Sequence, residues 1–326
     1  MAIPCQRGKR GRTGEGRLGG NAAILYGAHT FFIKFYYLCK YMETICNKYF
    51  EGERPLYCKK DGLRLENVVI GPGESSLKEG KDIEAVNCEF KGKYPFWECD
   101  GFTIKNCIFR EGARAALWYT RDCKMYDTLI EAPKMFRRIT GTYLENVKFT
   151  DAQETFWDCD KVTLKNVEAV NANYIFMHTD NIEVDNFKLQ GNYSFQYSKN
   201  VVIRNSNLDT KDAFWESENV TVYDSRINGE FLGWYAKNLK LVRCHIGGSQ
   251  PLCYCENLIL EDCTFEPDAN LAFEYSTVQA TVKGHVVSVK NPRSGRIEAG
   301  SIGEIILDEN IKKPGDCEIM TINRSE

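Results

Sequence analysis

Residues 181–208, NIEVDNFKLQGNYSFQYSKNVVIRNSNL, contain one pattern twice and thereby decide the fold. In the first copy Asn186 is followed three positions later by Leu189, and in the second copy Asn205 is followed by Leu208. Outward from this stretch, the same pair returns every nineteen to twenty-one residues. A fixed period of this length predicts stacked supersecondary units, each of which buries its apolar side against its neighbours.

The repeat extends through most of the 326 residues. We call its Asn or Asp position the anchor. The anchors are Asn67, Asn87, Asn106, Asp127, Asn146, Asn166, Asn186, Asn205, Asp224 and Asp262, and Arg243 occupies the one remaining step. Because the period is not interrupted, we expect one elongated solenoid rather than two ordinary domains.

A short strand precedes each anchor. Val184 and Ile182 lie two and four positions before Asn186, and Glu183 between them is polar. This alternation, rich in Val, Ile and Leu, recurs in the other repeats and predicts a strand with one buried face. An asparagine or glycine stands directly before the strand, as at Asn181, because these residues tolerate the left-handed backbone that a corner needs.

A further apolar column lies ten residues before the anchor. Its members are Phe96, Leu117, Phe136, Phe156, Phe176, Phe195 and Phe214. Each unit therefore offers two or three short strands, and strands of successive units pair in parallel. The sequence predicts an all-β fold, a right-handed single-stranded parallel β-helix (solenoid) of about eleven or more coils of 19–21 residues. A pentapeptide-repeat coil is the nearer alternative, whereas a left-handed hexapeptide helix is disfavoured because no six-residue sub-period occurs.

The repeat also divides the chain into segments. Residues 1–41 lie outside it, and we expect a leader that is disordered or not natively translated, with Met42 as the working start. A targeting or membrane segment is the alternative, and it is opposed by Lys34, which costs about 3 kcal/mol in a spanning helix. The other expected segments are an N-terminal cap at 42–62, the parallel β-helix at 63–284, and C-terminal coils, cap and tail at 285–326.

Composition limits the partners and the compartment. The net charge is -3, so the chain has no general attraction for nucleic acid or anionic membranes. Several of the fourteen cysteines directly follow an anchor, where other repeats carry Val147 or Val167. These cysteines are Cys88, Cys107, Cys244 and Cys263. The exchange with valine indicates buried thiols that act as small apolar residues, and we expect a reducing, cytoplasmic location.

All five tryptophans fall in one column, nine residues before the anchor. They are Trp97, Trp118, Trp157, Trp215 and Trp234. Because this column follows the inward phenylalanines, alternation predicts that the indoles point outward and form a platform for stacking sugars or planar rings. Tyr119 and Tyr197, one column further on, extend this predicted ligand-binding surface. The alternative is that the rings lie flat and cover the sheet.

The next column, eight residues before the anchor, carries ionisable groups. Neighbouring coils place Arg138, Asp158 and His178 in a row, with a spacing of about 5 Å. His178 beside Asp158 is a candidate general base, and Arg138 is a candidate for neutralising a substrate carboxylate. The alternative is a solvated row of hydrogen bonds and ion pairs.

Other chemistry has weaker support. Glu98, Asp158 and Glu216 share this column but stand three coils apart, about 14 Å, whereas glycosidase carboxylates lie within about 5–9.5 Å of each other. Only Asp160 or Glu218 could approach from the adjacent corner to complete a pair. The four histidines are scattered in sequence, and we expect neither a metal site nor a cofactor.

Five stretches of the chain also support a family resemblance. They are YPFW at 94–97, LWYT at 117–120, EAPK at 131–134, DAFW at 212–215 and SIGEIIL at 301–307. Through them the chain resembles an uncharacterised bacterial β-helix family, domain of unknown function 3737. The likeness covers roughly residues 42–311 and implies a β-helix fold. The family brings no established chemistry to these positions.

The favoured hypothesis is a β-helix protein that recognises a saccharide along its tryptophan-lined face. The first alternative is a non-catalytic scaffold that presents this face to another protein or to itself. The second is a polysaccharide lyase- or hydrolase-like enzyme that uses Arg138, Asp158 and His178. The expected partner is therefore an oligosaccharide or a protein, and neither nucleic acid nor a membrane is expected.

Overall fold

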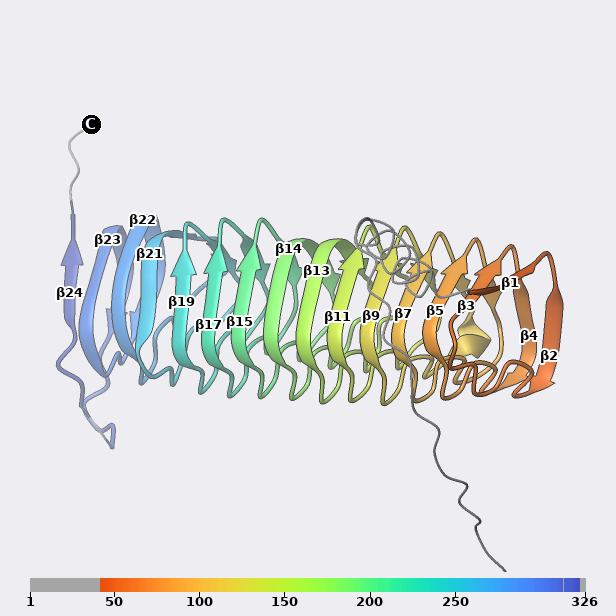
Figure 1. Ribbon diagram of the computed structural model, residues 1–326. Coiled ribbons are helices and arrows are strands. Elements are labelled where there is room, and N and C mark those ends of the chain that lie inside the picture. The colour runs from red at the N-terminus through yellow and green to blue at the C-terminus, as the bar shows by residue number, and fades with distance from the viewer. Residues whose placement is uncertain (1–41, 313, 323–326) are drawn as a thin grey trace, which may run out of the picture. The chain divides into compact units, whose positions relative to one another are not determined.

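The computed structural model describes residues 42–312 and 314–322. These residues form a solenoid of about 15 turns, built from short parallel strands joined by corners (Figure 1). A short 3-10 helix, η1 (Glu111–Ala113), interrupts one corner. The predicted leader at 1–41 lies outside the described residues.

The first ladder contains the strands that precede the anchors, each paired in parallel with the strand of the next coil. It consists of β1 (Glu43–Cys46), β3 (Leu63–Glu66), β5 (Lys81–Val86), β7 (Asp100–Lys105), β9 (Arg121–Tyr126), β11 (Thr140–Glu145), β13 (Asp160–Ala169), β14 (Asp180–Gln190), β15 (Lys199–Arg204), β17 (Glu218–Tyr223), β19 (Lys237–Val242), β21 (Leu258–Phe265), β22 (Thr277–Lys290), β23 (Ser294–Ile306) and β24 (Glu318–Thr321).

The second ladder lies just beyond the anchors and is also parallel. Its strands are β2 (Tyr49–Glu53), β4 (Val69–Glu74), β6 (Glu89–Phe90), β8 (Ile108–Phe109), β10 (Leu129–Ile130), β12 (Lys148–Phe149), β16 (Asn207–Asp209), β18 (Arg226–Asn228) and β20 (His245–Gly247). The longer strands β13, β14 and β21 take part in both ladders.

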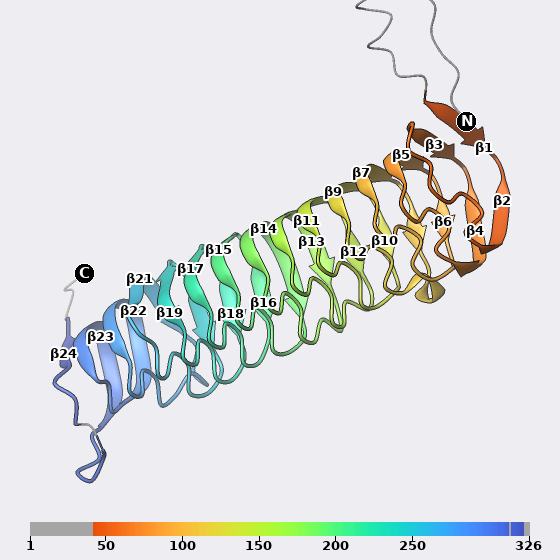
Figure 2. The ribbon, with the colours of Figure 1, turned by 60° about the horizontal axis from the view of Figure 1, so that its bottom comes forward.

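The coil is right-handed. In Figure 1 the strands β5 to β19 of the first ladder rise on the side toward the viewer while the chain advances from right to left. Figure 2, with the bottom turned forward, shows the same strands at the top of the solenoid. The predicted right-handed parallel β-helix is therefore confirmed.

The core consists of columns of like residues. Leu164, Val184 and Ile203 occupy one register position on successive strands, and each is buried. In the phenylalanine column, the ring centroids of Phe156 and Phe176 lie 4.9 Å apart with an interplanar angle of 5°. Each such buried side chain contributes roughly 1.5–3 kcal/mol relative to exposure. The stack of coils is thus the hydrophobic core.

Asparagine ladders run along two corners. Asn166 donates from Nδ2 to Oδ1 of Asn146 at 3.2 Å and accepts from Nδ2 of Asn186 at 2.9 Å. At the corner before the first-ladder strands, Asn200 donates to Asn181 at 3.1 Å. All five of these asparagines have φ between +53° and +58°. The left-handed corners predicted from the sequence are present.

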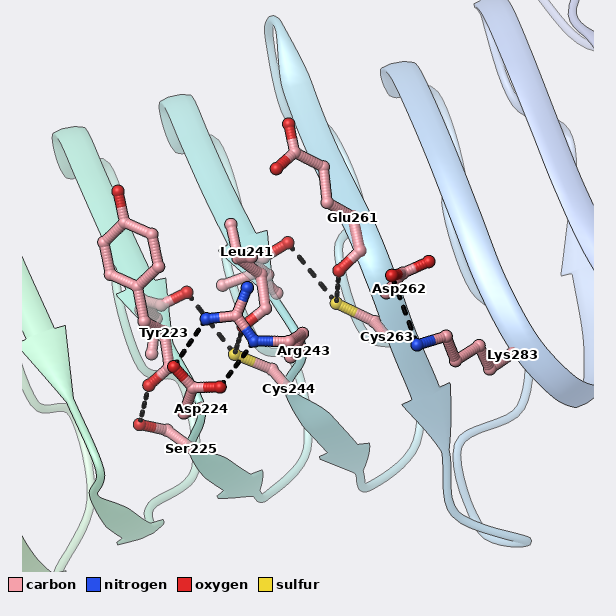
Figure 3. Close-up of polar contacts among 12 residues, drawn as sticks. Tyr223, Asp224, Ser225, Leu241, Arg243, Cys244, Glu261, Asp262, Cys263 and Lys283 are labelled. Atoms are coloured by element: carbon pink, nitrogen blue, oxygen red, sulfur yellow. Dashed lines mark hydrogen bonds and ion pairs between the residues drawn. The ribbon is translucent and has the colours of Figure 1, made fainter.

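Arg243 replaces asparagine at one anchor and keeps the coil-to-coil contact. Its Nε and Nη2 atoms each donate to a carboxylate oxygen of Asp224 at 2.6 Å (Figure 3). Beside it, Cys244 and Cys263 are buried in successive coils, and the Cys263 thiol donates to the carbonyl of Leu241 at 3.4 Å. Among the described residues twelve cysteines are free thiols.

The segment 42–62, for which the sequence predicts a cap, forms the first coil instead. β1 pairs with β3, and β2 pairs with β4. The cause is one earlier copy of the repeat, in which Asn47 has φ +53° and Phe50 follows three positions later, packed against the core. At the other end β23 and β24 continue the first ladder. Within residues 42–312 and 314–322, no helix is long and apolar enough to cross a membrane.

Replacing Val184 with aspartate is expected to abolish folding, because it places an unpaired carboxylate in the middle of a buried column. Glu183→Ala, at an exposed position of the same strand, is the control and is expected to change stability by no more than about 0.5 kcal/mol. Circular dichroism and thermal unfolding measure both variants. A Val184→Asp protein that melts like the wild type would contradict the buried column.

Asn166 combines a left-handed backbone with two ladder hydrogen bonds, and two substitutions separate these contributions. Asn166→Ala loses the bonds and also pays about 1–2 kcal/mol for a left-handed residue with a Cβ atom. Asn166→Gly loses the bonds but tolerates the backbone. Chemical denaturation is expected to rank stability as wild type, then glycine, then alanine. An alanine variant at least as stable as the glycine variant would show that the corner does not require this conformation.

Candidate functional site

The candidate site lies on the segment that closes each coil before the first-ladder strand. Positive φ recurs there at every second residue, as at Tyr193, Phe195 and Tyr197 with φ of 61°, 60° and 59°. Phe195 is fully buried, whereas Tyr197 is exposed. Backbone bonds to both neighbouring coils hold the segment, because Phe195 N donates to Ile175 O and Tyr197 N donates to Trp215 O. The repeated backbone therefore presents one set of residues outward in every coil.

We call the outward surface of this segment the aromatic face. It comprises three columns, at twelve, nine and eight positions before the anchor. Its ring-bearing members are Tyr94, Trp97, Trp118, Tyr119, Trp157, Tyr174, His178, Tyr193, Tyr197, Trp215, Phe231, Trp234, Tyr235, Tyr254 and Tyr275.

The tryptophans of this face are half-buried rather than fully exposed. The ring centroids of Trp97 and Trp118 lie 5.5 Å apart. Trp118 Nε1 donates to the carbonyl of Lys134 at 3.0 Å, and Trp157 Nε1 donates to the carbonyl of Tyr174 at 2.6 Å. These bonds tilt the indoles against the neighbouring coil. The rings therefore expose part of their surface and support the more exposed tyrosines.

Arg137 takes the place of a tryptophan in this column. Its guanidinium carbon lies 5.1 Å from the ring centroid of Trp118 and 4.2 Å from that of Trp157. Arg137 Nη2 also donates to Glu154 at 2.5 Å, and Lys134 pairs with the same carboxylate at 3.0 Å. Arg137 therefore continues the column of rings. Its guanidinium stacks between two indoles and is paired with Glu154.

The candidate catalytic residues lie in successive coils but do not form a catalytic pair. The carboxylate of Asp158 pairs with Arg138 at 3.7 Å rather than with His178. Arg138 also donates to the hydroxyl of Tyr119 at 3.4 Å. The imidazole of His178 stacks on the ring of Tyr197, with centroids 4.7 Å apart and 10° between planes. The structure thus brings the row together as an ion pair and a ring stack, without orienting His178 as a base.

The C-terminal part of the face contains rings that the sequence analysis did not select. Tyr235 and Tyr254 stack with centroids 4.9 Å apart, and Tyr254 and Tyr275 follow at 5.2 Å. The ring of Trp234 lies 6.4 Å from that of Trp215. Continuing the tyrosine column to the end of the repeat would have found all three tyrosines.

Asp212 is a second residue missed by the sequence analysis. Backbone bonds place it between Tyr193 and Phe231, in a column whose other members are mostly large. Asp212 is 5% exposed. Among the described residues, its carboxylate has no hydrogen bond or ion pair. Burial raises the pKa of Asp212, although the positive charge of Lys211 partly opposes this effect. Lys211 itself pairs with Glu230 at 3.1 Å.

The described surface offers shallow hollows. Two of them follow the asparagine corners and have volumes of 190 Å³ and 320 Å³. The first volume lies below, and the second close to, the lower limit of about 300 Å³ for ordinary small-molecule pockets. No group of three His, Cys, Asp or Glu residues in the described part of the chain is placed to hold a metal ion.

Comparison with known proteins identifies one matching family and several solved structures of similar fold. The model of a family described as "Protein of unknown function (DUF3737)" matches residues 43–320. A comparison with curated proteins gives no match.

Several solved structures are similar in part. The A-module of the mannuronan C-5 epimerase AlgE4 of Azotobacter vinelandii has a TM-score of 0.42 and 9% identity, over 86% of this chain and 91% of that one. PfbA, a surface adhesin of Streptococcus pneumoniae, has a TM-score of 0.44 and 9% identity, over 83% and 86%. HetL, a pentapeptide repeat protein of the cyanobacterium Nostoc sp. strain PCC 7120, has a TM-score of 0.30 and 12% identity, over 74% and 94%. These likenesses say nothing about function.

Asp212→Asn is expected to raise the melting temperature at neutral pH. A carboxyl group whose pKa is raised by folding adds stability only at low pH, and this contribution is lost as the pH rises through the folded pKa. The neutral amide avoids this loss, so its advantage should shrink as the pH falls toward the ordinary aspartate range. Thermal unfolding across pH measures the difference.

Glu216→Gln is the control for this measurement, because Glu216 lies on the same coil but is exposed. It is expected to leave the melting temperature unchanged. An Asp212→Asn protein that is less stable than the wild type at neutral pH would show that the carboxylate has a stabilising partner.

Proposed function

The chain belongs to the DUF3737 family, whose function is unknown, and we propose that it is a non-catalytic protein that recognises an extended saccharide along its aromatic face. The observation that carries the proposal is a line of exposed tyrosine rings backed by half-buried tryptophans. Tyr119, Tyr197 and Tyr235 are 43%, 37% and 46% exposed. Exposed aromatic surface of this extent on a folded protein usually marks a binding site.

The length of the face fits a polymer better than a single sugar. Backbone bonds connect Tyr119 to Tyr235 through six coil steps, which corresponds to roughly 29 Å at about 4.8 Å per coil. Successive sugar rings of an extended chain are spaced on the order of one coil. Each ring of such a ligand could therefore contact the side chains of one coil.

The chemistry of the face also supports sugar binding. A sugar offers one apolar ring face and a rim of hydroxyl groups, so it is matched by aromatic rings with polar groups beside them. The ion pair of Arg138 with Asp158 and the hydroxyl of Tyr197 are such polar groups. Because Asp158 forms an ion pair with Arg138, the row of Arg138, Asp158 and His178 favours ligand binding over catalysis.

Scaffolding is the second candidate function, and one observation favours it. The indole N–H groups of Trp118 and Trp157 are satisfied by backbone carbonyls, so they are not available to hydroxyl groups of a ligand. A protein partner, or a second copy, could cover the same rings. The free thiols of the described cysteines support a reducing, cytoplasmic compartment for either function.

Tyr197→Ala and Tyr235→Ala are each expected to weaken saccharide binding by about 3- to 10-fold, through loss of one stacking ring. Isothermal titration of the full chain against a panel of neutral, acidic and amine-bearing oligosaccharides measures the affinity. Both positions are exposed, so the variants are expected to fold.

Tyr143→Ala is the matched control, because Tyr143 lies on β11, outside the aromatic face. The affinity of the Tyr143→Ala variant for saccharide should equal that of the wild type. The proposal fails if no oligosaccharide binds, or if Tyr143→Ala weakens binding as much as the other two variants. Self-association in light scattering that Tyr235→Ala abolishes, with no saccharide bound, would establish the scaffold instead.

A further inference from the structure

We infer that the part of the aromatic face around Asp212 selects a sugar that carries a protonated amine, in preference to a neutral or uronate sugar. This inference rests on the proposed function and names the class of ligand. The subsite consists of Asp212, Trp215 and Glu216 on one coil, with Phe231, Trp234 and Tyr235 on the next.

Asp212 has a largely buried side chain without a partner among the described residues. Buried carboxylates normally have hydrogen bonds or an ion pair, since an unpaired buried charge is costly. Asp212 is 5% exposed and has no such partner among the described residues. The neighbouring cation, Lys211, is engaged by Glu230 at 3.1 Å and lies over the ring of Phe231. The carboxylate therefore has no donor among the described residues, and a ligand could supply one.

The position of Asp212 makes this requirement available to a ligand. The residues before and after it in the column, Tyr193 and Phe231, are partly exposed and belong to the aromatic face. The ring of Phe231 packs against that of Trp234, with centroids 4.9 Å apart. The short side chain of Asp212 thus stands in its column between two larger rings. A donor group on a ligand that stacks on these rings would be held next to the carboxylate.

The charged side chains of this subsite also favour a cationic ligand. Glu216, on the same coil, is exposed and has no ion pair in the described part of the chain. In the middle of the face, by contrast, Asp158 is neutralised by Arg138 and Glu154 by Arg137. Asp212 and Glu216, neither of which has a hydrogen bond or ion pair among the described residues, thus flank Trp215 in the sequence. They repel a uronate and attract a cation.

The aromatic rings of this subsite also favour an amine. An ammonium group is attracted to the faces of tryptophan and tyrosine as well as to carboxylates. Trp215 and Trp234 lie 6.4 Å apart, and the ring of Tyr235 lies 6.4 Å from that of Trp234. Rings and carboxylates at one place match an amine on a sugar ring, because the ring stacks while the amine pairs. A neutral sugar would use only the rings.

The test is isothermal titration of the full chain at a pH at which the sugar amine is protonated. The probes are glucosamine oligosaccharides, their N-acetylated counterparts and oligogalacturonates of equal length. The glucosamine oligosaccharide is expected to bind about tenfold more tightly than either of the others. Asp212→Asn is expected to remove most of this preference, whereas affinity for the acetylated oligosaccharide stays the same. Asp212→Glu is expected to keep part of it.

Glu183→Gln, an equal change of net charge at an exposed position of β14, controls for long-range electrostatics and should keep the preference. Equal binding of the amine and acetylated forms, tighter binding of the uronate, or a preference unchanged in Asp212→Asn would overturn the inference while leaving saccharide recognition standing. If no oligosaccharide of any charge binds, the proposed function fails and the inference fails with it.

Discussion

The parallel pairing of each coil with the next is the constraint on which every other feature depends. In this arrangement a residue contacts its equivalents one period before and after it. Apolar residues such as Leu164 and Val184 then form a continuous core, and polar residues at the corners form continuous hydrogen-bonded rows. A side chain at one repeat position therefore contributes to a column and not to a single contact.

The corners make this pairing possible. A coil of about twenty residues must turn several times, and each turn needs backbone that most residues avoid. At Asn166 and Asn186 the anchor asparagine supplies both the left-handed conformation and a side chain that bonds its counterpart. Arg243 shows that the contact matters more than the residue type, because it reaches Asp224 with two hydrogen bonds.

Much of the fold could be predicted because its determinants are periodic in the sequence. The anchor spacing, the alternation around Val184 and the phenylalanine column each indicate the coil independently. The first coil was missed as such because Asn47 and Phe50 form a single further copy of the pair at the edge of the pattern, where one copy is easily overlooked. Repetition makes interior coils predictable and leaves the ends uncertain.

The site was predicted less completely, because a surface side chain can pair with either of its neighbours in the row and the sequence does not say which. The sequence places Asp158 between Arg138 and His178 but does not say which neighbour it pairs with, and the structure pairs it with Arg138. The exposure of Trp157 depends on a bond to the backbone of Tyr174 in the next coil, which spacing alone does not reveal. Asp212 stands in a column that also holds Ala115, Lys134 and Glu154, so no periodic signal marks it.

The asparagine rows also have a direction. In both rows the amide nitrogen of the later coil donates to the oxygen of the earlier one, as from Asn186 to Asn166 and from Asn200 to Asn181. The side-chain dipoles therefore align along the axis, and hydrogen bonds in such a chain polarise one another. The row before the first-ladder strands starts at Asp160, whose carboxylate accepts from Asn181, and its last bond runs from Asn257 to Asn238. A residue that replaces an interior asparagine of either row must therefore accept from the later coil and donate to the earlier one to keep both bonds.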